Sequence, residues 1–301
     1  MFKKRETVVQ NITYLALMAA INVIFVLLTG LLPPLMFILV FILPLTNTVV
    51  TIFCKKRYFP IYMIVTVLLC LLTSYGLHTL DTFFYVIPSI ITGFIFGIMI
   101  EKKVCAIHIF AATTVAQYLL TFLTFLIAGI IVPDGNFFNV FFNMFGLNEF
   151  VFKEVFAHVF CFLLASIQMI FTYIVVKFEI RKLGYQINLN ESIYYLSNII
   201  SLLMVFIAIG MYFLYAPLVY IFIFVSIIYT VYQMIELIAT KKKLWILLLV
   251  GIIIISAFLF ALLYQYPVKP LSIVLLSIPL GLINIVHFTN NYLINKQSCV
   301  K

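Results

Sequence analysis

The chain has 301 residues, of which 66% are hydrophobic and only 9% are charged, and its mean hydropathy is +1.26. Soluble globular domains carry about 25% charged residues, so this composition excludes a water-soluble fold. The net charge of +9 does not indicate a nucleic-acid surface, because the lysines and arginines stand in short clusters between apolar runs. We therefore expect an integral membrane protein that contacts membrane lipid and no nucleic acid.

Ten apolar segments are long enough to cross a bilayer, since about 20 helical residues at 1.5 Å each span its hydrocarbon core. The predicted spans are residues 9–30, 34–53, 59–77, 83–100, 104–132, 150–177, 194–214, 217–239, 244–266 and 271–288. The predicted fold class is all-α, a polytopic transmembrane helix bundle of about ten spans.

The positions of the positive charges test this count. With ten spans, both chain ends and every second connection lie on one side of the membrane, and that side holds all the lysines and arginines except Lys153 and Lys269. Because cytoplasmic loops are enriched in Lys and Arg, we expect both termini in the cytoplasm. The heavy use of Ile, Phe, Lys, Asn and Tyr suits an AT-rich bacterial genome, which predicts a bacterial cell (plasma) membrane location.

A polar run, FEIRKLGYQINLNES at residues 178–192, divides the chain. It predicts a six-span module at residues 1–178, a cytoplasmic connection at 179–193, and a four-span module with a short cytoplasmic tail at 194–301. The outer connection at 132–150 alternates Asn with pairs of Phe and is typical of a segment lying on the membrane surface.

Small residues recur at a spacing of four. Ala16 and Ala20 share one helix face in the first span, and Gly93 and Gly97 repeat the spacing in the fourth. Membrane helices associate through close approach at small side chains. Two interpretations stay open for each pair: packing inside the bundle, or a flat outer face against which another subunit can pack.

The run ITYLALMAAINVIFVLLTGLLPPLMFILVFILPL at residues 12–45 resembles the first two helices of the substrate-binding (S) components of energy-coupling-factor transporters. IPSIITGFIFGIMIEKK at 87–103 resembles their fourth helix, and over the full length the chain resembles the YybS-like group of uncharacterised bacterial membrane proteins, with RKLG at 181–184. The resemblance implies an S-component-like front module that docks through Ala16 and Ala20 on an energy-coupling transmembrane subunit with ATPases. S components usually have six spans, so the four-span module is a departure.

Polar residues near the outer ends of the spans are candidates for binding a small-molecule solute. Glu154 and His158 share a helix face, and together with Gln117 and Thr121 they predict a polar pocket that opens outward. His78 and Asp81 lie in a neighbouring outer connection. The alternative is that Glu154 lies at the water interface, that His158 bonds a neighbouring carbonyl group, and that the polar groups of the outer connection are simply hydrated.

Two further polar residues lie within predicted spans. Asn22 is expected either to bond a neighbouring helix or to contact ligand. Glu236 is expected to anchor its span by pairing with one of the lysines at 241–243.

Enzymatic chemistry is not indicated. The four histidines stand apart, without an H-E-x-x-H motif, and the chain has neither a G-x-S-x-G elbow nor a Walker A loop. The five cysteines show no C-x-x-C spacing. We expect no enzyme activity, no cofactor and no metal site.

Two functions remain. The first is a solute-binding or transport component similar to S components, and the alternative is a non-transporting scaffold in cell-envelope assembly or division. A secondary transporter built from repeats is a weaker third hypothesis, because the two halves show no similarity and no buried acid pair suits proton coupling.

Overall fold

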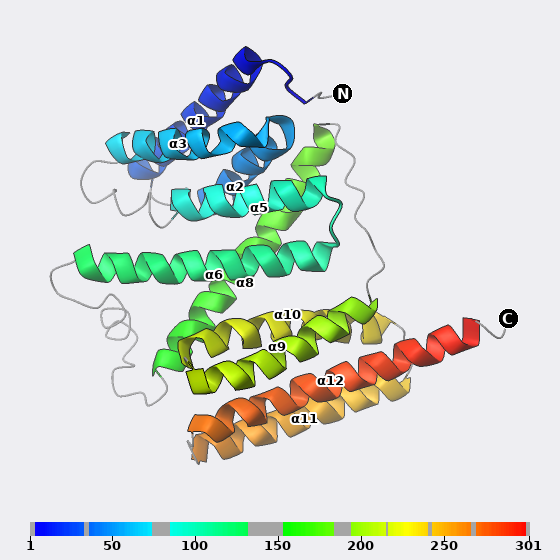
Figure 1. Ribbon diagram of the computed structural model, residues 1–301. Coiled ribbons are helices and arrows are strands. Elements are labelled where there is room, and N and C mark those ends of the chain that lie inside the picture. The colour runs from blue at the N-terminus through cyan, green and yellow to red at the C-terminus, as the bar shows by residue number, and fades with distance from the viewer. Residues whose placement is uncertain are drawn as a thin grey trace. The chain divides into compact units, whose positions relative to one another are not determined.

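The computed structural model describes residues 4–32, 36–73, 85–131, 153–183, 194–214, 216–239, 243–265 and 269–298. All regular secondary structure within these ranges is helical (Figure 1). The helices are α1 (Val8–Leu31), α2 (Met36–Phe53), η2 (Lys56–Tyr58), α3 (Phe59–Thr73), α5 (Ile87–Glu101), α6 (Ala106–Ile131), α8 (Lys153–Lys182), α9 (Tyr194–Leu214), α10 (Ala216–Ala239), α11 (Lys243–Gln265) and α12 (Lys269–Ser298).

The all-α class is confirmed for the described residues, where each of the ten α-helices overlaps one predicted span. Five described helical stretches are long and apolar enough to cross a membrane: Val8–Thr29, Lys56–Thr73, Ala106–Phe125, Ala157–Lys182 and Val219–Ala239. Shorter apolar helices accompany them. The prediction that all ten helices cross the bilayer is not decided by these lengths and stays a prediction.

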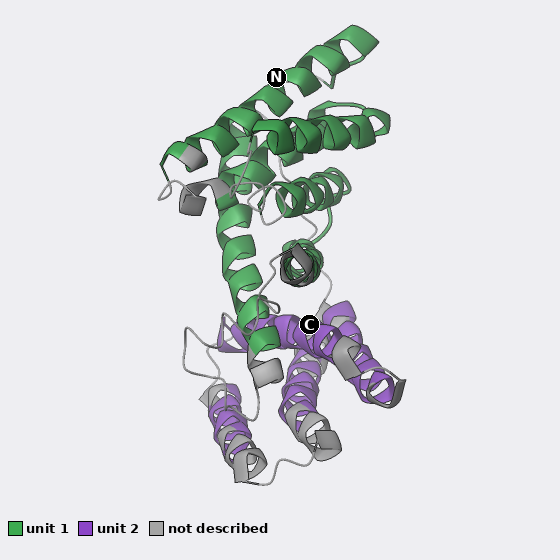
Figure 2. Ribbon diagram, turned by 90° about the vertical axis from the view of Figure 1, so that its left-hand side faces the viewer, with its two compact units in different colours: residues 1–190 green, residues 191–301 purple. Residues whose placement is uncertain are grey.

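The chain divides into two compact units, Met1–Asn190 and Glu191–Lys301 (Figure 2). The first contains α1 to α8 and the second contains α9 to α12. The helix α8 continues through Lys182, four residues into the stretch predicted as a connection. No Gly or Pro interrupts it before Gly184, and the basic residues Arg181 and Lys182 suit the negative end of the helix dipole.

In the first unit, α2 and α5 approach closely at the Gly-x-x-x-Gly pair. A Cβ atom added to Gly93 would lie 2.6 Å from both the Asn47 Cβ and the Pro44 carbonyl oxygen, and one added to Gly97 would overlap Thr51. Real Cβ atoms essentially never come this near to a neighbour. Of the two interpretations of this glycine pair, packing inside the bundle is therefore the correct one.

Three helices of the first unit meet at a network of buried polar side chains, here called the asparagine network: Asn22 of α1, Thr46 and Asn47 of α2, and Tyr62 of α3. The Asn22 Nδ2 donates to the Tyr62 hydroxyl at 2.8 Å, and the Asn22 Oδ1 accepts from Thr46 Oγ1 at 2.6 Å. The Tyr62 hydroxyl donates to Asn47 Oδ1 at 2.7 Å. Of the two interpretations of Asn22, interhelical hydrogen bonding is the one observed.

Salt bridges connect charged residues at one end of the first unit. Glu101, at the end of α5, accepts from the ammonium groups of Lys4 at 2.8 Å and Lys56 at 2.6 Å. Partial burial acts to raise the pKa of this carboxyl, but the hydrogen bonds and charges of the two lysines outweigh it and lower the pKa below its ordinary value.

In the second unit, α9 packs on α10, and α12 packs on α9, α10 and α11. Trp245, Leu249 and Ile252 of α11 form an apolar cluster with Leu237 of α10 and Ile283 of α12. A second apolar cluster joins Ala208 of α9 to Val219 and Ile223 of α10. These contacts hold α9, α10 and α12 together around the polar residues that follow.

Candidate functional site, a buried polar cluster in the second unit

Eight polar side chains from three helices of the second unit form what we call the polar cluster: Asn198 and Ser201 of α9, Ser226, Thr230, Gln233 and Glu236 of α10, and Asn284 and His287 of α12. The α10 members recur every three or four residues, so they share one helix face. Seven of the eight are buried. Such a concentration of polar groups is costly inside a membrane helix bundle and marks a functional site by default.

One half of the cluster is built of neutral groups around the Ser201 hydroxyl. Its Oγ lies 3.0 Å from Ser226 Oγ and 3.2 Å from Thr230 Oγ1. It also accepts a hydrogen bond from Asn284 Nδ2 at 2.9 Å. These contacts cross between α9, α10 and α12, so they fix the three helices at a single level.

The other half contains the ionisable pair. Nε2 of His287 lies 2.7 Å from Oε2 of Glu236, and Nδ1 lies 2.9 Å from Oδ1 of Asn198. The imidazole is 1% exposed and the Glu236 side chain is 19% exposed. A histidine held between a carboxylate and an amide within a helix bundle is a group that can accept or pass on a proton.

Several polar atoms of the cluster have no hydrogen-bond partner among the described residues. They are Asn198 Nδ2, Asn284 Oδ1, and both Oε1 and Nε2 of Gln233. An unpaired buried polar group costs about 1–3 kcal/mol, so a molecule that supplied the missing donors and acceptors would recover this free energy. These are the atoms of the cluster that the described protein groups leave available for a further hydrogen bond.

The sequence-based interpretation missed this cluster. Glu236 was expected to pair with a lysine at 241–243, whereas its carboxylate contacts His287; the side chains of those lysines lie outside the described part of the chain. The available signal was the helical spacing of Ser226, Thr230, Gln233 and Glu236 within one predicted span. This spacing predicts a polar face on the helix, but it does not predict that His287 of another helix contacts Glu236 on that face.

The site predicted in the first unit is described only in part. Gln117 and Thr121 lie one turn apart on α6, and Gln117 Nε2 donates to Thr121 Oγ1 at 3.4 Å. The Gln117 Oε1 atom is buried, and no group in the described part of the chain bonds it. The side chain of Glu154 on α8, and the whole of His78 and Asp81, lie outside the described residues.

The fourth residue of that predicted pocket, His158 of α8, is buried against α6. Its Nδ1 lies 2.7 Å from the Tyr118 hydroxyl, and its ring stacks on Phe122 with centroids 4.9 Å apart. The helices α6 and α8 thus bring His158 to Tyr118, the neighbour of Gln117. Tyr118 was not among the predicted residues.

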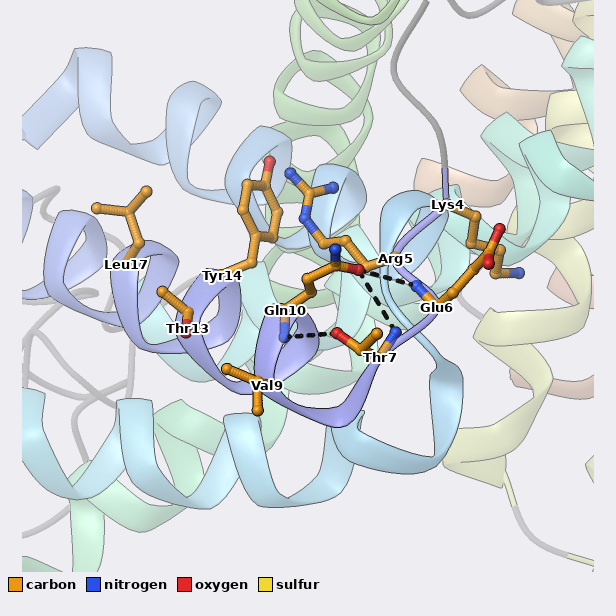
Figure 3. A pocket seen from close by; sticks show the side chains of 9 residues that line it. All are labelled: Lys4, Arg5, Glu6, Thr7, Val9, Gln10, Thr13, Tyr14 and Leu17. Carbon is orange, nitrogen blue, oxygen red and sulfur yellow. Dashed lines mark hydrogen bonds between the residues drawn. The ribbon is translucent and has the colours of Figure 1, made fainter.

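A surface hollow of about 640 Å³ lies at the start of α1 (Figure 3). Its polar groups serve the helix end: Thr7 and Gln10 form a reciprocal capping box, and the Arg5 guanidinium lies over the Tyr14 ring at 3.3 Å. A capping box satisfies backbone N–H groups at the helix start. The hollow is therefore part of the attachment of the N-terminal segment.

The described residues are all-helical and include five helices long and apolar enough to cross a membrane, which is the class of an all-α membrane protein. No family model matches the chain, and neither the curated proteins nor the solved structures include a significant match. The resemblance to S components and to the YybS-like group stays a prediction.

Proposed function

We propose that the protein is an integral membrane component that binds a small polar solute for transport, and that the polar cluster of α9, α10 and α12 is its binding site. The observation that carries this proposal is the set of unpartnered amide atoms on Gln233, Asn198 and Asn284. They lie beside an ionisable pair, in a unit that also contains two apolar clusters.

The solute fits the chemistry of these side chains. Hydroxyl and amide groups bind neutral hydroxyl, carbonyl and amide groups of a ligand. A vitamin-like compound has such groups in quantity, as the resemblance to S components also implies.

A binding screen tests this function and locates its site. Purified protein is heated with individual vitamins and metabolites, and a bound compound raises the melting temperature by mass action. A compound that stabilises the wild type but not Gln233→Leu binds at the polar cluster. A compound that loses its effect in Gln117→Leu instead binds at the site predicted in the first unit, and this matched Gln→Leu change serves as the control.

A docking face on α1 supports the further proposal that the protein works with another membrane subunit. Ala16 and Ala20 are both exposed, whereas Ala19, next to them around the helix, is buried. Exposed Ile12 and Ile24 continue the same face at intervals of four residues. An energy-coupling subunit with ATPases is the partner that the resemblance implies.

The same face favours the alternative function, a non-transporting membrane scaffold in cell-envelope assembly or division. Replacing Ala16 and Ala20 with Phe is expected to abolish co-purification with membrane partners in mild detergent while expression is unchanged. Co-purified ATPases together with a solute hit support the transport component. Other partners without any solute hit support the scaffold, and unchanged co-purification contradicts docking at this face.

A further inference from the structure

The pair formed by His287 and Glu236 has a geometry that the proposed solute site does not require. The shortest contacts of the two ring nitrogens of His287 are to the Glu236 carboxylate at 2.7 Å and to the Asn198 side-chain oxygen at 2.9 Å. The Asn291 side-chain nitrogen lies farther away, 3.4 Å from each ring nitrogen. An ionised carboxylate and an amide oxygen are both acceptors. An imidazole with two acceptors satisfies both when it carries a proton on each nitrogen.

We propose that His287 and Glu236 together form a proton-binding site inside the second unit, which takes up its proton through Glu236. A proton that arrives on the Glu236 carboxyl passes to Nε2 of His287 across the 2.7 Å contact. The carboxylate regains its negative charge, the ring becomes an imidazolium, and its Nδ1–H donates to Asn198 Oδ1. The pair holds one exchangeable proton in either arrangement.

The route to water follows from the positions of the two residues. Glu236 is three residues from the end of α10 at Ala239, about 4.5 Å along the helix axis, and three lysines follow at 241–243. The partly exposed Glu236 carboxylate thus lies between the aqueous end of the helix and the buried imidazole. Proton-carrying residues in membrane proteins are typically Asp, Glu and His in such chains.

Few other described side chains of the second unit could bind and release a proton. The helix α9 offers no titratable side chain there, and α11 contributes the apolar Trp245, Leu249 and Ile252. The remaining titratable groups are the phenols of Tyr220, Tyr229 and Tyr232 on α10. Tyrosine ordinarily ionises only near pH 10, so the exchange of a proton at neutral pH falls to the histidine and the carboxylate.

Nuclear magnetic resonance of the full-length protein in detergent tests the proposal without any solute. The histidine side chains are labelled with nitrogen-15, His287→Gln identifies the signals of the ring, and the signals are followed from pH 5 to 9. We expect the ring signals of His287 to change from those of imidazolium to those of neutral imidazole as the pH is raised. In Glu236→Gln the opposite charge is absent, so the midpoint of this change is expected to differ from that of the wild type.

The control is His158 in the first unit, whose signals should be the same in the wild type and in Glu236→Gln. A wild-type His287 ring that stays in one form across the range overturns the proposal, as does a midpoint unchanged in Glu236→Gln. Because no solute is present, a failed solute screen leaves this result standing. A solute that binds while His287 does not titrate refutes only the proton site.

Discussion

In the first unit, Asn22, Asn47 and Tyr62 are buried and every side-chain nitrogen and oxygen among them has a partner. In the second unit, Gln233 is equally buried and neither of its amide atoms has one. Both regions lie where three helices meet. The two regions differ in how many of their polar atoms already have a hydrogen-bond partner. A network in which every polar atom is bonded has no donor or acceptor left for a ligand, whereas a network with unbonded atoms can bond a ligand.

The comparison extends to charge and to helix packing. The asparagine network contains no carboxylate and no imidazole, whereas the polar cluster contains both. The first unit also brings helices together at glycines, while Gly210, Gly251 and Gly281 of the second have nothing within 4 Å of an added Cβ. We therefore interpret the asparagine network as a group of residues that holds helices together, and the polar cluster as the candidate functional site.

The largest expected effect concerns the tight helix contact of the first unit. Gly93→Ala places a methyl group against the Pro44 carbonyl oxygen and Asn47, neither of which can move without shifting α2. We expect a loss of about 3 kcal/mol in the free energy of unfolding, measured by detergent-induced unfolding followed by circular dichroism. Gly251→Ala in the second unit is the control and should be neutral, and equal losses in the two variants would contradict the comparison.

The next effect concerns the asparagine network. Asn47→Leu removes the acceptor of the Tyr62 O–H among buried residues, so that the hydroxyl keeps only the hydrogen bond that it accepts from Asn22. We expect a loss of about 1–2 kcal/mol in the free energy of unfolding, in the range measured for interhelical hydrogen bonds in membranes. The same unfolding measurement checks it, and a stability equal to that of the wild type would show that this network is dispensable.

A smaller effect is expected for the same kind of change in the polar cluster. Gln233→Leu removes two polar atoms that have no partner in the free protein. We therefore expect stability within about 0.5 kcal/mol of the wild type or slightly above it, together with loss of solute binding in the thermal screen. A destabilisation as large as that of Asn47→Leu would mean that Gln233 is a structural residue.

The smallest effect concerns pH and the Glu101 carboxylate. Its pKa is lowered in the folded protein by Lys4 and Lys56 against the effect of burial. Its stabilising contribution is therefore complete above the ordinary glutamate pKa of 4.5 and is lost as the pH falls through the lowered value. These side chains are partly exposed to solvent, which screens their interaction, so we expect a contribution of less than about 1 kcal/mol.

This pH dependence is measured as the melting temperature of the wild type and of Glu101→Gln from pH 3 to 7. The difference between them should shrink toward the acid end. A difference that grows as the pH falls would contradict the assigned direction of the pKa shift.

Much of the fold can be predicted from local pattern, because the length of an apolar run and the breakers that bound it are properties of adjacent residues. The ten predicted spans therefore coincide with helices, and Gln117 and Thr121 fall one turn apart as their spacing requires. The ends of α8 and α12 were predicted several residues too early. Apolar length marks the hydrocarbon core, and a helix can continue beyond it into polar residues.

The sequence by itself determined the class of this protein, since so few charges and so many long apolar runs leave the bilayer as the only suitable solvent. Only the tertiary structure decided which polar residues act together. His287 is 51 residues from Glu236 and 89 from Asn198, and no local spacing brings such distant residues together. Their contact depends on how α9, α10 and α12 pack, which is set by the apolar side chains around them.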